Sequence, residues 1–288
     1  MTLIPGVLPP SIETYNLACQ LFKYFPLFAS VQWLTAWYPA GKTSIDSRFN
    51  LPGRFAWAVM ETPGLAIVLY SILTLPDQLG LSPLPWANYT LAGLYVIHYV
   101  YRAWLYPLMA PSMSPIHPLP FLGAILFNVL NGLSIGGWTG GYGPTTVEEW
   151  SESGTIYRLE IGMVIWGWSL LAVIFHDDDL REIRRAAGRI QKEKAEKEGG
   201  KAQGVDKVYM VPKNGLFKFI LYPHYFCEWI EWTGYWIIGG WGFGPARTFL
   251  INEISAMLPR AVRGRRWYIE KFGKEKIGSR KAVIPGIL

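Results

Sequence analysis

Long runs of apolar residues recur along this chain, and their lengths are close to what a helix needs to cross a lipid bilayer. The runs lie at about 12–36, 55–76, 84–108, 117–138, 157–176, 215–241 and 245–262. The last run is the weakest, because its core, TFLINEISAML, is short and contains Glu253. Backbone polar groups in hydrocarbon must bond within their own segment, so each run is predicted to be a helix. The pattern therefore predicts an all-α fold in which residues 1–288 form a single bundle of seven transmembrane helices.

The composition supports a polytopic membrane protein. Hydrophobic residues make up 51% of the chain and charged residues 17%, whereas about a quarter of the residues in an average soluble domain are charged. These values exclude disordered, collagen-like and coiled-coil chains. Cys19 and Cys227 both lie in apolar runs, so we expect two buried thiols and no disulfide framework. The first residues, MTLIPGVLPP, lack a basic segment, so the first span is expected to act as the targeting signal.

Basic residues gather in stretches that the predicted spans place on one side of the membrane. Of the 27 Lys and Arg residues, nine lie in the loop at 180–210 and nine more from Arg260 to the end, while the loop at 37–54 adds three. Cytosolic loops of membrane proteins are enriched in Lys and Arg. We therefore expect an outside N-terminus, a basic cytosolic loop at about 180–210 and a basic cytosolic tail at about 263–288.

This topology also explains the net charge of +6, which does not indicate a nucleic-acid partner, because such binding needs a basic face on a soluble module. In a eukaryotic cell we expect an integral, multi-pass protein of the endoplasmic reticulum membrane. The stretch RRAAGRIQKEKAEKEGGKAQGVDK, from Arg184, is predicted to be a solvated helix that fades into a linker.

Two local patterns imitate functional motifs. The glycine clusters at 136–143 and 239–244 lie at the outer ends of predicted spans and lack the strand and helix of a dinucleotide fingerprint, so they are predicted to be turns. Asn88-Tyr89-Thr90 is a glycosylation sequon, but it lies at the membrane edge, where we do not expect modification.

Ionisable residues inside the predicted spans point to function. A charged side chain in mid-membrane costs about 2.5–3.5 kcal/mol on insertion scales, so it needs a partner, a cavity or a ligand. Three spans carry such groups, and the helical spacing within a span puts them on one face. They are Glu61 in the second span, Tyr99, Arg102 and Tyr106 in the third, and His224, Glu228 and Glu231 in the sixth. They could form a buried ionic network that only fixes helix register, or a functional site.

A metal site is not expected. His176 and the three aspartates that follow it end the fifth span, but consecutive residues of a helix point in different directions and cannot all bind one ion. The four histidines form no H-x-x-x-H pair. We predict instead that this helix end carries a cytosolic ligand site.

Two long motifs in the C-terminal half connect this chain to a known family. They are KVYMVPKNGLFKFILYPHYFCEWIEWTGYW, from Lys207, and RAVRGRRWYIEKFGKEKIGSRKAVIPGIL, from Arg260. Upstream, GRFAWAVMETPG and HYVYRAWLYPL stand in the places of the second- and third-helix motifs of that family. The chain resembles the steroid 5α-reductases over most of its length after residue 50. The resemblance implies a seven-helix membrane fold and NADPH-dependent reduction of a carbon–carbon double bond conjugated to a ketone, as in a 3-oxo-Δ4 steroid.

The resemblance also implies roles for individual residues. Glu61 and Tyr99 match the pair that hydrogen-bonds the substrate carbonyl. The positions assigned to the cofactor are Arg102, Tyr106, Asp178, Arg185, Tyr209, His224, Glu228, Arg260 and Tyr268. His224 stands where the steroid enzymes commonly have asparagine. Polar residues of the relatives are replaced at or near Met60, Met113, Ile174 and Gly264. The implied partners are NADPH, a lipophilic substrate and membrane lipid, and we expect a monomer.

The implied chemistry makes physical sense. Hydride transfer to an enone places negative charge on the carbonyl oxygen, and donors that already point at that oxygen stabilise the enolate in a dry site. In apolar surroundings Glu61 can stay protonated and donate alongside the Tyr99 hydroxyl. Arg185 and Arg260, at cytosolic helix ends, can hold the cofactor phosphates through charge-assisted hydrogen bonds.

Three alternatives stay open on the sequence alone. A reductase of the same family could act on a polyprenal or an enoyl thioester, which Met60 beside Glu61 favours. An isoprenylcysteine-type membrane methyltransferase, which uses S-adenosylmethionine, has a similar helical plan, although the Tyr268-x-x-x-Phe272 pattern argues against it. A non-catalytic scaffold or lipid-binding protein would not need Glu61 and Tyr99.

Overall fold

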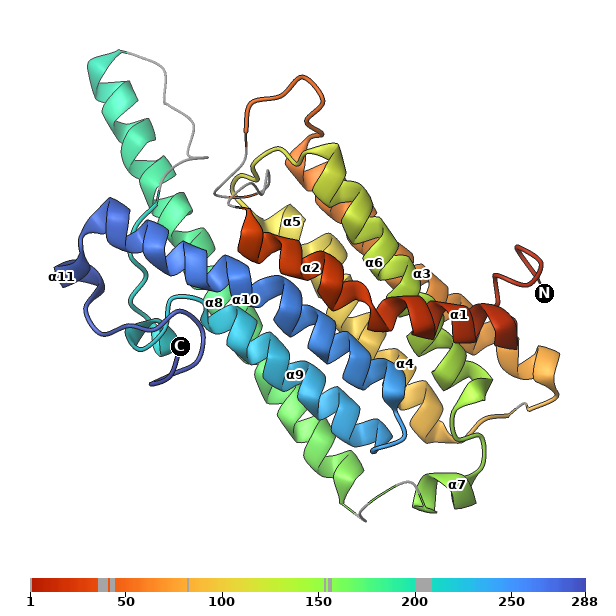
Figure 1. Ribbon diagram of the computed structural model, residues 1–288. Helices are drawn as coiled ribbons and strands as arrows, with labels where there is room; N and C mark the ends of the chain where they lie inside the picture. Colours follow the sequence, from red (N-terminus) through yellow and green to blue (C-terminus); the bar gives the residue numbers. More distant parts are fainter. Residues whose placement is uncertain are drawn as a thin grey trace.

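The computed structural model shows an elongated bundle of helices (Figure 1). It describes residues 2–35, 41, 45–81, 83–152, 154, 157–199 and 209–288. Within these residues the only β pairing is in isolated bridges, so the predicted all-α fold is confirmed.

The helices follow the predicted runs, with shifted ends. The first half forms α1 (Ile12–Lys23), α2 (Phe25–Leu34), α3 (Gly53–Leu79), α4 (Trp86–Tyr99), the π-helical η2 (Val100–Leu105), α5 (Tyr106–Met109), α6 (Pro118–Gly137) and the π-helical η3 (Trp138–Tyr142). The second half forms α7 (Val147–Glu152), α8 (Arg158–Glu198), the 3-10 turn η4 (Gly215–Lys218), α9 (Pro223–Gly239), α10 (Gly244–Phe272) and α11 (Lys274–Ile277).

Three of the described helices are long and apolar enough to cross a membrane. They are Gly53–Leu79, Pro118–Tyr142 and Arg158–Glu198. Each of the other predicted runs also contains a helix, but the count of seven crossings stays a prediction.

The first predicted span is two helices instead of one. Helix α1 ends at Tyr24, and Pro26 lies in the first turn of α2. Proline has no N–H group and its ring clashes with the carbonyl group four residues earlier, so a straight helix cannot continue through it. As a result α1 packs against α6, while α2 packs against α10.

The sixth predicted span begins too early. Residues 215–222 form η4 and an extended segment, and the last N–H groups of that segment donate to the carbonyl groups of Lys281 and Ala282, at 3.0 Å each. Helix α9 starts only at Pro223, whose missing N–H is not needed in a first turn. The C-terminal tail therefore packs onto the protein, with Val283 fully buried.

The fifth and seventh predicted spans are parts of longer helices. Helix α8 runs for 41 residues to Glu198, so the helical part of the predicted solvated segment is confirmed. Its expected linker, at 200–208, lies outside the described residues. Helix α10 extends ten residues beyond the predicted end at 262 and reaches Phe272.

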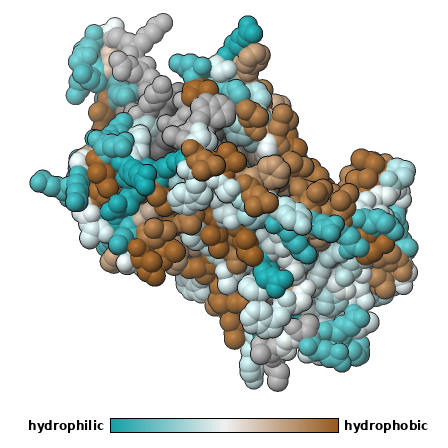
Figure 2. Space-filling view, in the orientation of Figure 1, coloured by the Kyte–Doolittle hydropathy of each residue, from teal (hydrophilic) through white to brown (hydrophobic). Residues whose placement is uncertain are grey.

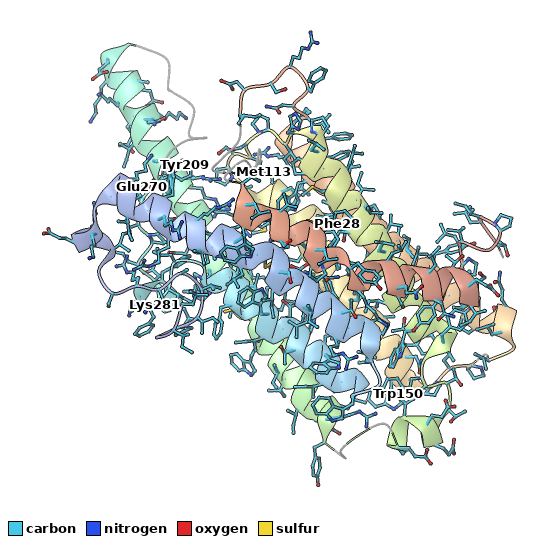
Figure 3. The ribbon with its side chains drawn as sticks, viewed as in Figure 1. Phe28, Met113, Trp150, Tyr209, Glu270 and Lys281 are labelled. Atoms are coloured by element: carbon cyan, nitrogen blue, oxygen red, sulfur yellow. The ribbon has the colours of Figure 1, made fainter. Side chains whose placement is uncertain are left out.

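The two ends of the bundle differ in character. The charged extension of α8, residues 45–52 before α3, and α11 lie at one end, which we call the basic end, and α7 lies at the other (Figure 1). Figure 2 shows hydrophilic residues at both ends of this face and a broad apolar area between them. Figure 3 places Tyr209 and Met113 at the basic end and Trp150 at the opposite end. The N- and C-termini lie at opposite ends, which agrees with an odd number of crossings.

Glycines bring α3 and α6 unusually close together. A Cβ atom at Gly132 would lie 3.0 Å from the Gly64 Cα atom, and one at Gly136 would lie 2.9 Å from the Ser71 hydroxyl. Small residues allow helix backbones to approach in a membrane. Gly136 is therefore part of a helix contact, and the prediction of a turn there is wrong. The second cluster does form a turn, with Gly240 at φ +79° between α9 and α10.

Asn88, on α4, connects several chain segments at the end of the bundle opposite the basic end. Its amide nitrogen donates to the carbonyl groups of Thr139 and Pro144, at 2.9 Å each, and its amide oxygen accepts from the Trp150 indole at 2.8 Å. The side chain is fully buried. Glycosylation of the Asn88 sequon is therefore incompatible with this fold.

Replacing Asn88 by Leu should lower the midpoint of thermal unfolding, because three buried hydrogen bonds are lost and their partners stay buried. A buried polar group left without a partner costs about 1–3 kcal/mol. Thermal unfolding of detergent-purified protein, followed by tryptophan fluorescence, measures the change. Ser151→Ala, an exposed change on α7, is the control and should keep the wild-type midpoint. A wild-type midpoint for Asn88→Leu would contradict the role of this side chain.

Candidate active site

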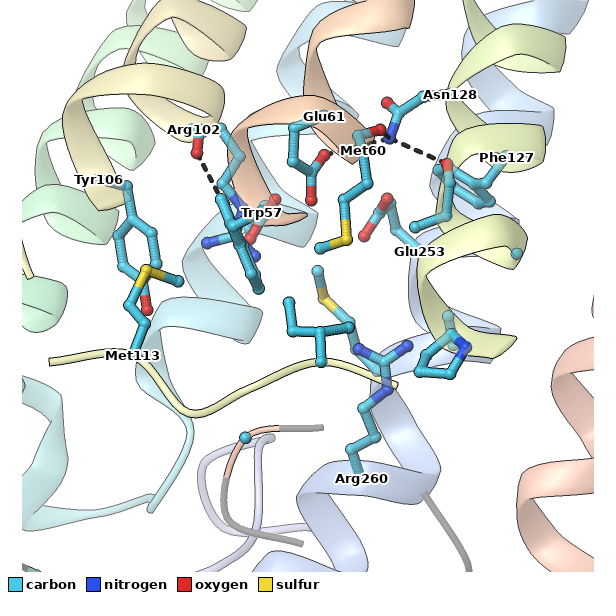
Figure 4. A pocket seen from close by; sticks show the side chains of 18 of the residues that line it. Trp57, Met60, Glu61, Arg102, Tyr106, Met113, Phe127, Asn128, Glu253 and Arg260 are labelled. Atoms are coloured by element: carbon cyan, nitrogen blue, oxygen red, sulfur yellow. Dashed lines mark hydrogen bonds between the residues drawn. The ribbon is translucent and has the colours of Figure 1, made fainter. Parts of the chain in front are cut away.

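A cavity of about 660 Å³ lies inside the bundle (Figure 4), and its lining extends to Met113 and Tyr209 at the basic end. Residues of α1, α2, α3, α4, η2, α5, α6, α8, α9 and α10 line it. Most of the sequence-predicted site residues meet there, although they come from distant parts of the chain. They are Glu61, Tyr99, Arg102, Tyr106, Tyr209, Glu228, Arg260 and Tyr268.

Asp178 and Arg185 do not line the cavity. The lining face of α8 carries Asp177, Arg181 and Arg184 instead, which follow the four- and three-residue spacing of one helix face. Asp178 and Arg185 pair with each other, at 3.3 Å, on the more exposed neighbouring face. Each assigned residue is thus one position away from the residue that lines the cavity, and one position on a helix turns a side chain by about 100°.

His224 also lies outside the cavity lining. Its ring packs against the rings of Tyr222 and Tyr225, with centroids 5.7 and 4.6 Å away, in the first turn of α9. The same helix reaches the cavity one turn later, at Glu228.

Glu61 projects from α3 into the cavity. Its Oε2 atom accepts a hydrogen bond of 3.2 Å from the amide nitrogen of Asn128, on α6. The same nitrogen donates to the Met60 carbonyl at 2.9 Å. In Figure 4 the carboxyl groups of Glu61 and Glu253 point into one space, which the Met60 side chain also enters.

Tyr99 is held at the end of α4. Its ring stacks on the Tyr95 ring, with centroids 4.5 Å apart and an angle of 26° between the planes. The Asn131 amide nitrogen donates to the Tyr95 hydroxyl at 3.0 Å and to the Tyr99 hydroxyl at 3.4 Å. Tyr99 is 3% exposed, so its hydroxyl has a fixed position at the cavity wall.

Arg102 lies in η2, where the helix widens into a π turn. Its guanidinium group lies over the rings of Trp57 and Tyr106, 4.9 and 5.2 Å from their centroids, and the Trp57 indole donates to its backbone carbonyl at 2.9 Å. Among the described residues this guanidinium forms no ion pair within 4.0 Å. A direct Glu61–Arg102 pair that only locks two helices is therefore not what holds Glu61.

His98 is a cavity residue that the sequence analysis overlooked. Its Nδ1 atom lies 2.7 Å from Glu231 and its Nε2 atom 3.7 Å from Glu228, and all three side chains are buried. The two acids do share a face of α9, as predicted, and their partner is this histidine of α4. The sequence prediction used the helix face that carries Tyr99, Arg102 and Tyr106 and did not include His98. A histidine within a predicted membrane span is itself an indication of function.

Arginines crowd the part of the cavity toward the basic end. Arg181 is 4% exposed and donates to the Tyr101 hydroxyl, which in turn donates to Asp177 at 3.0 Å. Arg184 donates to the Ser112 carbonyl at 3.2 Å. Burial raises the pKa of the neighbouring Tyr268 to about 12, so that this phenol stays protonated.

Helix α10 supplies a second polar edge that the sequence analysis only partly found. Glu253, Ala256, Met257 and Arg260 line the cavity at helical spacing. The Arg260 Nε group donates to Gln32 on α2, at 3.1 Å. Glu253 had counted only as an obstacle to membrane insertion. Glu253 lies about two helical turns before Arg260 and therefore on the same face of the helix, and this spacing was the available signal.

The replaced positions have different structural consequences. A Cβ atom at Gly264 would overlap the hydroxyl of Tyr222, which fills the space of the missing side chain. Met60 and Met113 line the cavity. Ile174 does not; it packs against the hydrophobic core. In the described part of the chain, no three His, Cys, Asp or Glu residues are grouped so that they could hold a metal ion.

Comparison with known proteins agrees with the resemblance found in the motifs. The family described as 3-oxo-5-alpha-steroid 4-dehydrogenase matches residues 114–288. An uncharacterized protein of Schizosaccharomyces pombe is 35% identical over 86% of this chain and 89% of its own length. The protein named steroid 5-alpha-reductase DET2 of Solanum lycopersicum is 30% identical, over 92% of this chain and 93% of its own. The 3-oxo-5-alpha-steroid 4-dehydrogenase 1 of Bos taurus is 29% identical over 86% of each.

Gly264→Ala should lower the midpoint of thermal unfolding, because the new Cβ atom would collide with the Tyr222 hydroxyl in a packed region. Gly167→Ala is the matched control, since nothing lies within 4 Å of a Cβ atom at that helical position. Alanine is favoured over glycine by about 0.5–1 kcal/mol in a helix, so the control should match or exceed the wild-type midpoint. Equal midpoints for the two variants would show that Tyr222 does not occupy this space.

Proposed function

This chain belongs to the steroid 5α-reductase (3-oxo-5-alpha-steroid 4-dehydrogenase) family of oxidoreductases that act on CH–CH groups, and we propose that it reduces the carbon–carbon double bond of a lipophilic α,β-unsaturated ketone with hydride from NADPH. A 3-oxo-Δ4 steroid is the proposed substrate, reduced at the 5α position. The membership sets aside the methyltransferase and scaffold alternatives. The proposed setting is the endoplasmic reticulum membrane, with the basic end cytosolic.

One observation carries the proposal: Glu61 and Tyr99, from α3 and α4, face a single cavity of about 660 Å³. Much of the wall is apolar, with Phe25, Phe127 and Met257 among the residues that line it. Such a wall suits a lipid-soluble ring system, while two polar groups at one place suit its single ketone oxygen.

The proposed roles of these two groups follow from the charge that the reaction creates. Addition of hydride to the β-carbon breaks the C=C π bond and moves its electron pair toward the ketone, so negative charge develops on the carbonyl oxygen. Glu61, as a protonated carboxyl, and Tyr99 each donate a hydrogen bond to that oxygen. A proton that comes from water then adds to the α-carbon and restores the ketone, which completes the reduction.

The cavity residues toward the basic end fit an anionic dinucleotide. Arg181, Arg184 and Arg260 supply guanidinium groups, which bind phosphate through paired hydrogen bonds. The Nε atom of Arg181 is buried without a hydrogen-bond partner among the described residues, so it has a donor to offer. Tyr209 and Tyr268 add aromatic surface. When bound, NADPH would supply the hydride and leave as NADP+.

A polyprenal is the second candidate substrate. Met60 places a flexible thioether beside Glu61, and methionine adapts to irregular apolar shapes. A linear aldehyde conjugated to a double bond would use the same two donors.

Arg184→Ala should raise the Michaelis constant for NADPH, and Arg185→Ala should not. Loss of one charge-assisted hydrogen bond costs about 1.5–3 kcal/mol, or about 10- to 150-fold in affinity. Arg185 is the matched control, because it is the adjacent arginine and lies outside the cavity lining. Steady-state kinetics with NADPH and NADH measure the effect. The opposite result, a change for Arg185→Ala alone, would favour the assignment from sequence over the one from the cavity.

Glu61→Gln and Tyr99→Phe should each lower turnover by about 10²–10³, the usual loss when one donor to an oxyanion is removed. NADPH binding and thermal stability should stay close to wild type. Glu160→Gln and Tyr157→Phe are controls of the same chemistry at exposed positions of α8. Turnover of a 3-oxo-Δ4 steroid and of a polyprenal, measured side by side, also identifies the preferred substrate. Unchanged turnover in both site variants would remove the proposed role.

A further inference from the structure

We propose that Asn128 and Asn131, one turn apart on α6, are positioning residues that make the Glu61 carboxyl and the Tyr99 hydroxyl donate toward the substrate. The inference rests on the proposed function, in which those two groups bind the ketone oxygen. Neither asparagine is marked by a sequence motif, and both side chains are buried, at 2% and 0% exposed.

The hydrogen bonds of Asn128 settle which way its amide faces. Its nitrogen lies 2.9 Å from the Met60 carbonyl oxygen, 3.2 Å from the Ala124 carbonyl oxygen and 3.2 Å from Glu61 Oε2. Backbone carbonyl groups can only accept hydrogen bonds, so the NH₂ group must occupy this side. Glu61 Oε2 is therefore an acceptor.

This contact determines where a proton on Glu61 can point. A protonated carboxyl group has one O–H donor. Because Oε2 already faces an N–H group, the proton belongs on Oε1, the oxygen that Asn128 does not contact. Asn128 thus leaves Glu61 with a single free donor, and Glu61 lines the cavity.

Asn131 does the same for Tyr99. Its amide nitrogen donates to the hydroxyl oxygens of Tyr95 and Tyr99, at 3.0 and 3.4 Å. The Tyr99 hydroxyl also shares a hydrogen bond with the Tyr95 hydroxyl. Because Asn131 donates to both phenol oxygens, the Tyr99 O–H can exchange the Tyr95 oxygen for a ketone oxygen while its own oxygen stays bonded to Asn131. The stack on Tyr95, at 4.5 Å, prevents the ring from following a different partner.

The fold brings both asparagines to these positions through the close contact of α3 and α6. Gly64 and Gly132 meet across this contact, which lets Asn128 reach the backbone of α3 directly. The amide oxygens of Asn128 and Asn131 are buried without partners among the described residues. The amide oxygen of Asn252, on α10, is buried without a described partner as well, so Asn252 matches the two asparagines in this respect.

The first test replaces each asparagine by Leu. With NADPH and a 3-oxo-Δ4 steroid, kcat per folded enzyme should fall about 10- to 100-fold, while the Michaelis constant for NADPH changes less than about twofold. Asn252→Leu is the matched control. Asn252 is also fully buried, donates one helix-to-helix bond of 2.9 Å to Phe22, and lies outside the cavity lining. Its variant should keep wild-type kcat.

The second test uses Asn128→Asp and Asn131→Asp, which keep the shape of the side chain. A protonated aspartic acid can still donate to Glu61 or Tyr99, whereas an ionised aspartate can only accept. The kcat of these variants should therefore fall as pH rises from about 5 to 8, a range in which wild-type kcat should change little. If a Leu variant does not fold, the pH profile of the Asp variant decides.

Wild-type kcat in the Leu variants, or wild-type pH profiles in the Asp variants, would overturn the inference. A loss of kcat in Asn252→Leu equal to that in Asn131→Leu would do so too, because it would indicate a general effect of losing a buried amide. The failure of the proposed function is separate and appears first: wild-type enzyme would then reduce no enone with NADPH. Wild-type activity with unaffected variants removes only the positioning role.

Discussion

Charged side chains inside an apolar bundle must be balanced by one another, and the arrangement of this protein depends on that requirement. Eight charged residues line the cavity, four acids and four arginines: Glu61, Asp177, Glu228, Glu253, Arg102, Arg181, Arg184 and Arg260. They come from α3, η2, α8, α9 and α10, so none of these helices can leave the bundle without separating a charged group from the groups that balance it. Close ion pairs are few at the cavity, and aromatic rings, histidine and amides supply most of the direct contacts. Arg181 pairs with Asp178 at 3.2 Å, whereas among the described residues the Arg102 guanidinium forms no ion pair within 4.0 Å and its charge can serve a ligand.

The close approach of α3 and α6 fixes the positions of the polar side chains around the cavity. Gly64 and Gly132 allow the two backbones to touch, so that Asn128 and Asn131 reach groups of the neighbouring helices with short side chains. Short side chains have few rotamers, so they restrict the positions of the groups to which they hydrogen-bond. The π turn at η2 makes a similar contribution, because it widens the helix at Arg102, where π turns often accompany functional sites.

The sequence predicted the membrane class, the helical fold and the family, and most of the residues that it assigned to a site line the cavity. These depend on hydropathy, helical spacing and motif identity, which the chain carries locally. The predictions and the structure differ where a sequence motif does not specify which of several adjacent residues faces inward. In the run of three aspartates on α8, the pattern alone could not say whether Asp177 or Asp178 faces inward. The assigned residues, Asp178 and Arg185, lie one position away from the residues that line the cavity. Residues 215–222 looked like the start of a span because they are largely apolar, but the backbone of Leu221 and Tyr222 pairs with the C-terminal tail.

What the sequence determined by itself is the pair of groups proposed to bind the substrate: Glu61 and Tyr99 belong to local motifs, and an acid within an apolar run is unusual enough to be noticed alone. The tertiary structure decided which groups assist them. His98 meets Glu231, and Asn131 meets Tyr99, across distances of 133 and 32 residues in the chain. No local pattern encodes these pairings, because they depend on the glycine contact between helices and on the rotation of each helix about its axis. Side-chain packing of the whole bundle sets that rotation, and hydropathy is too coarse to specify it.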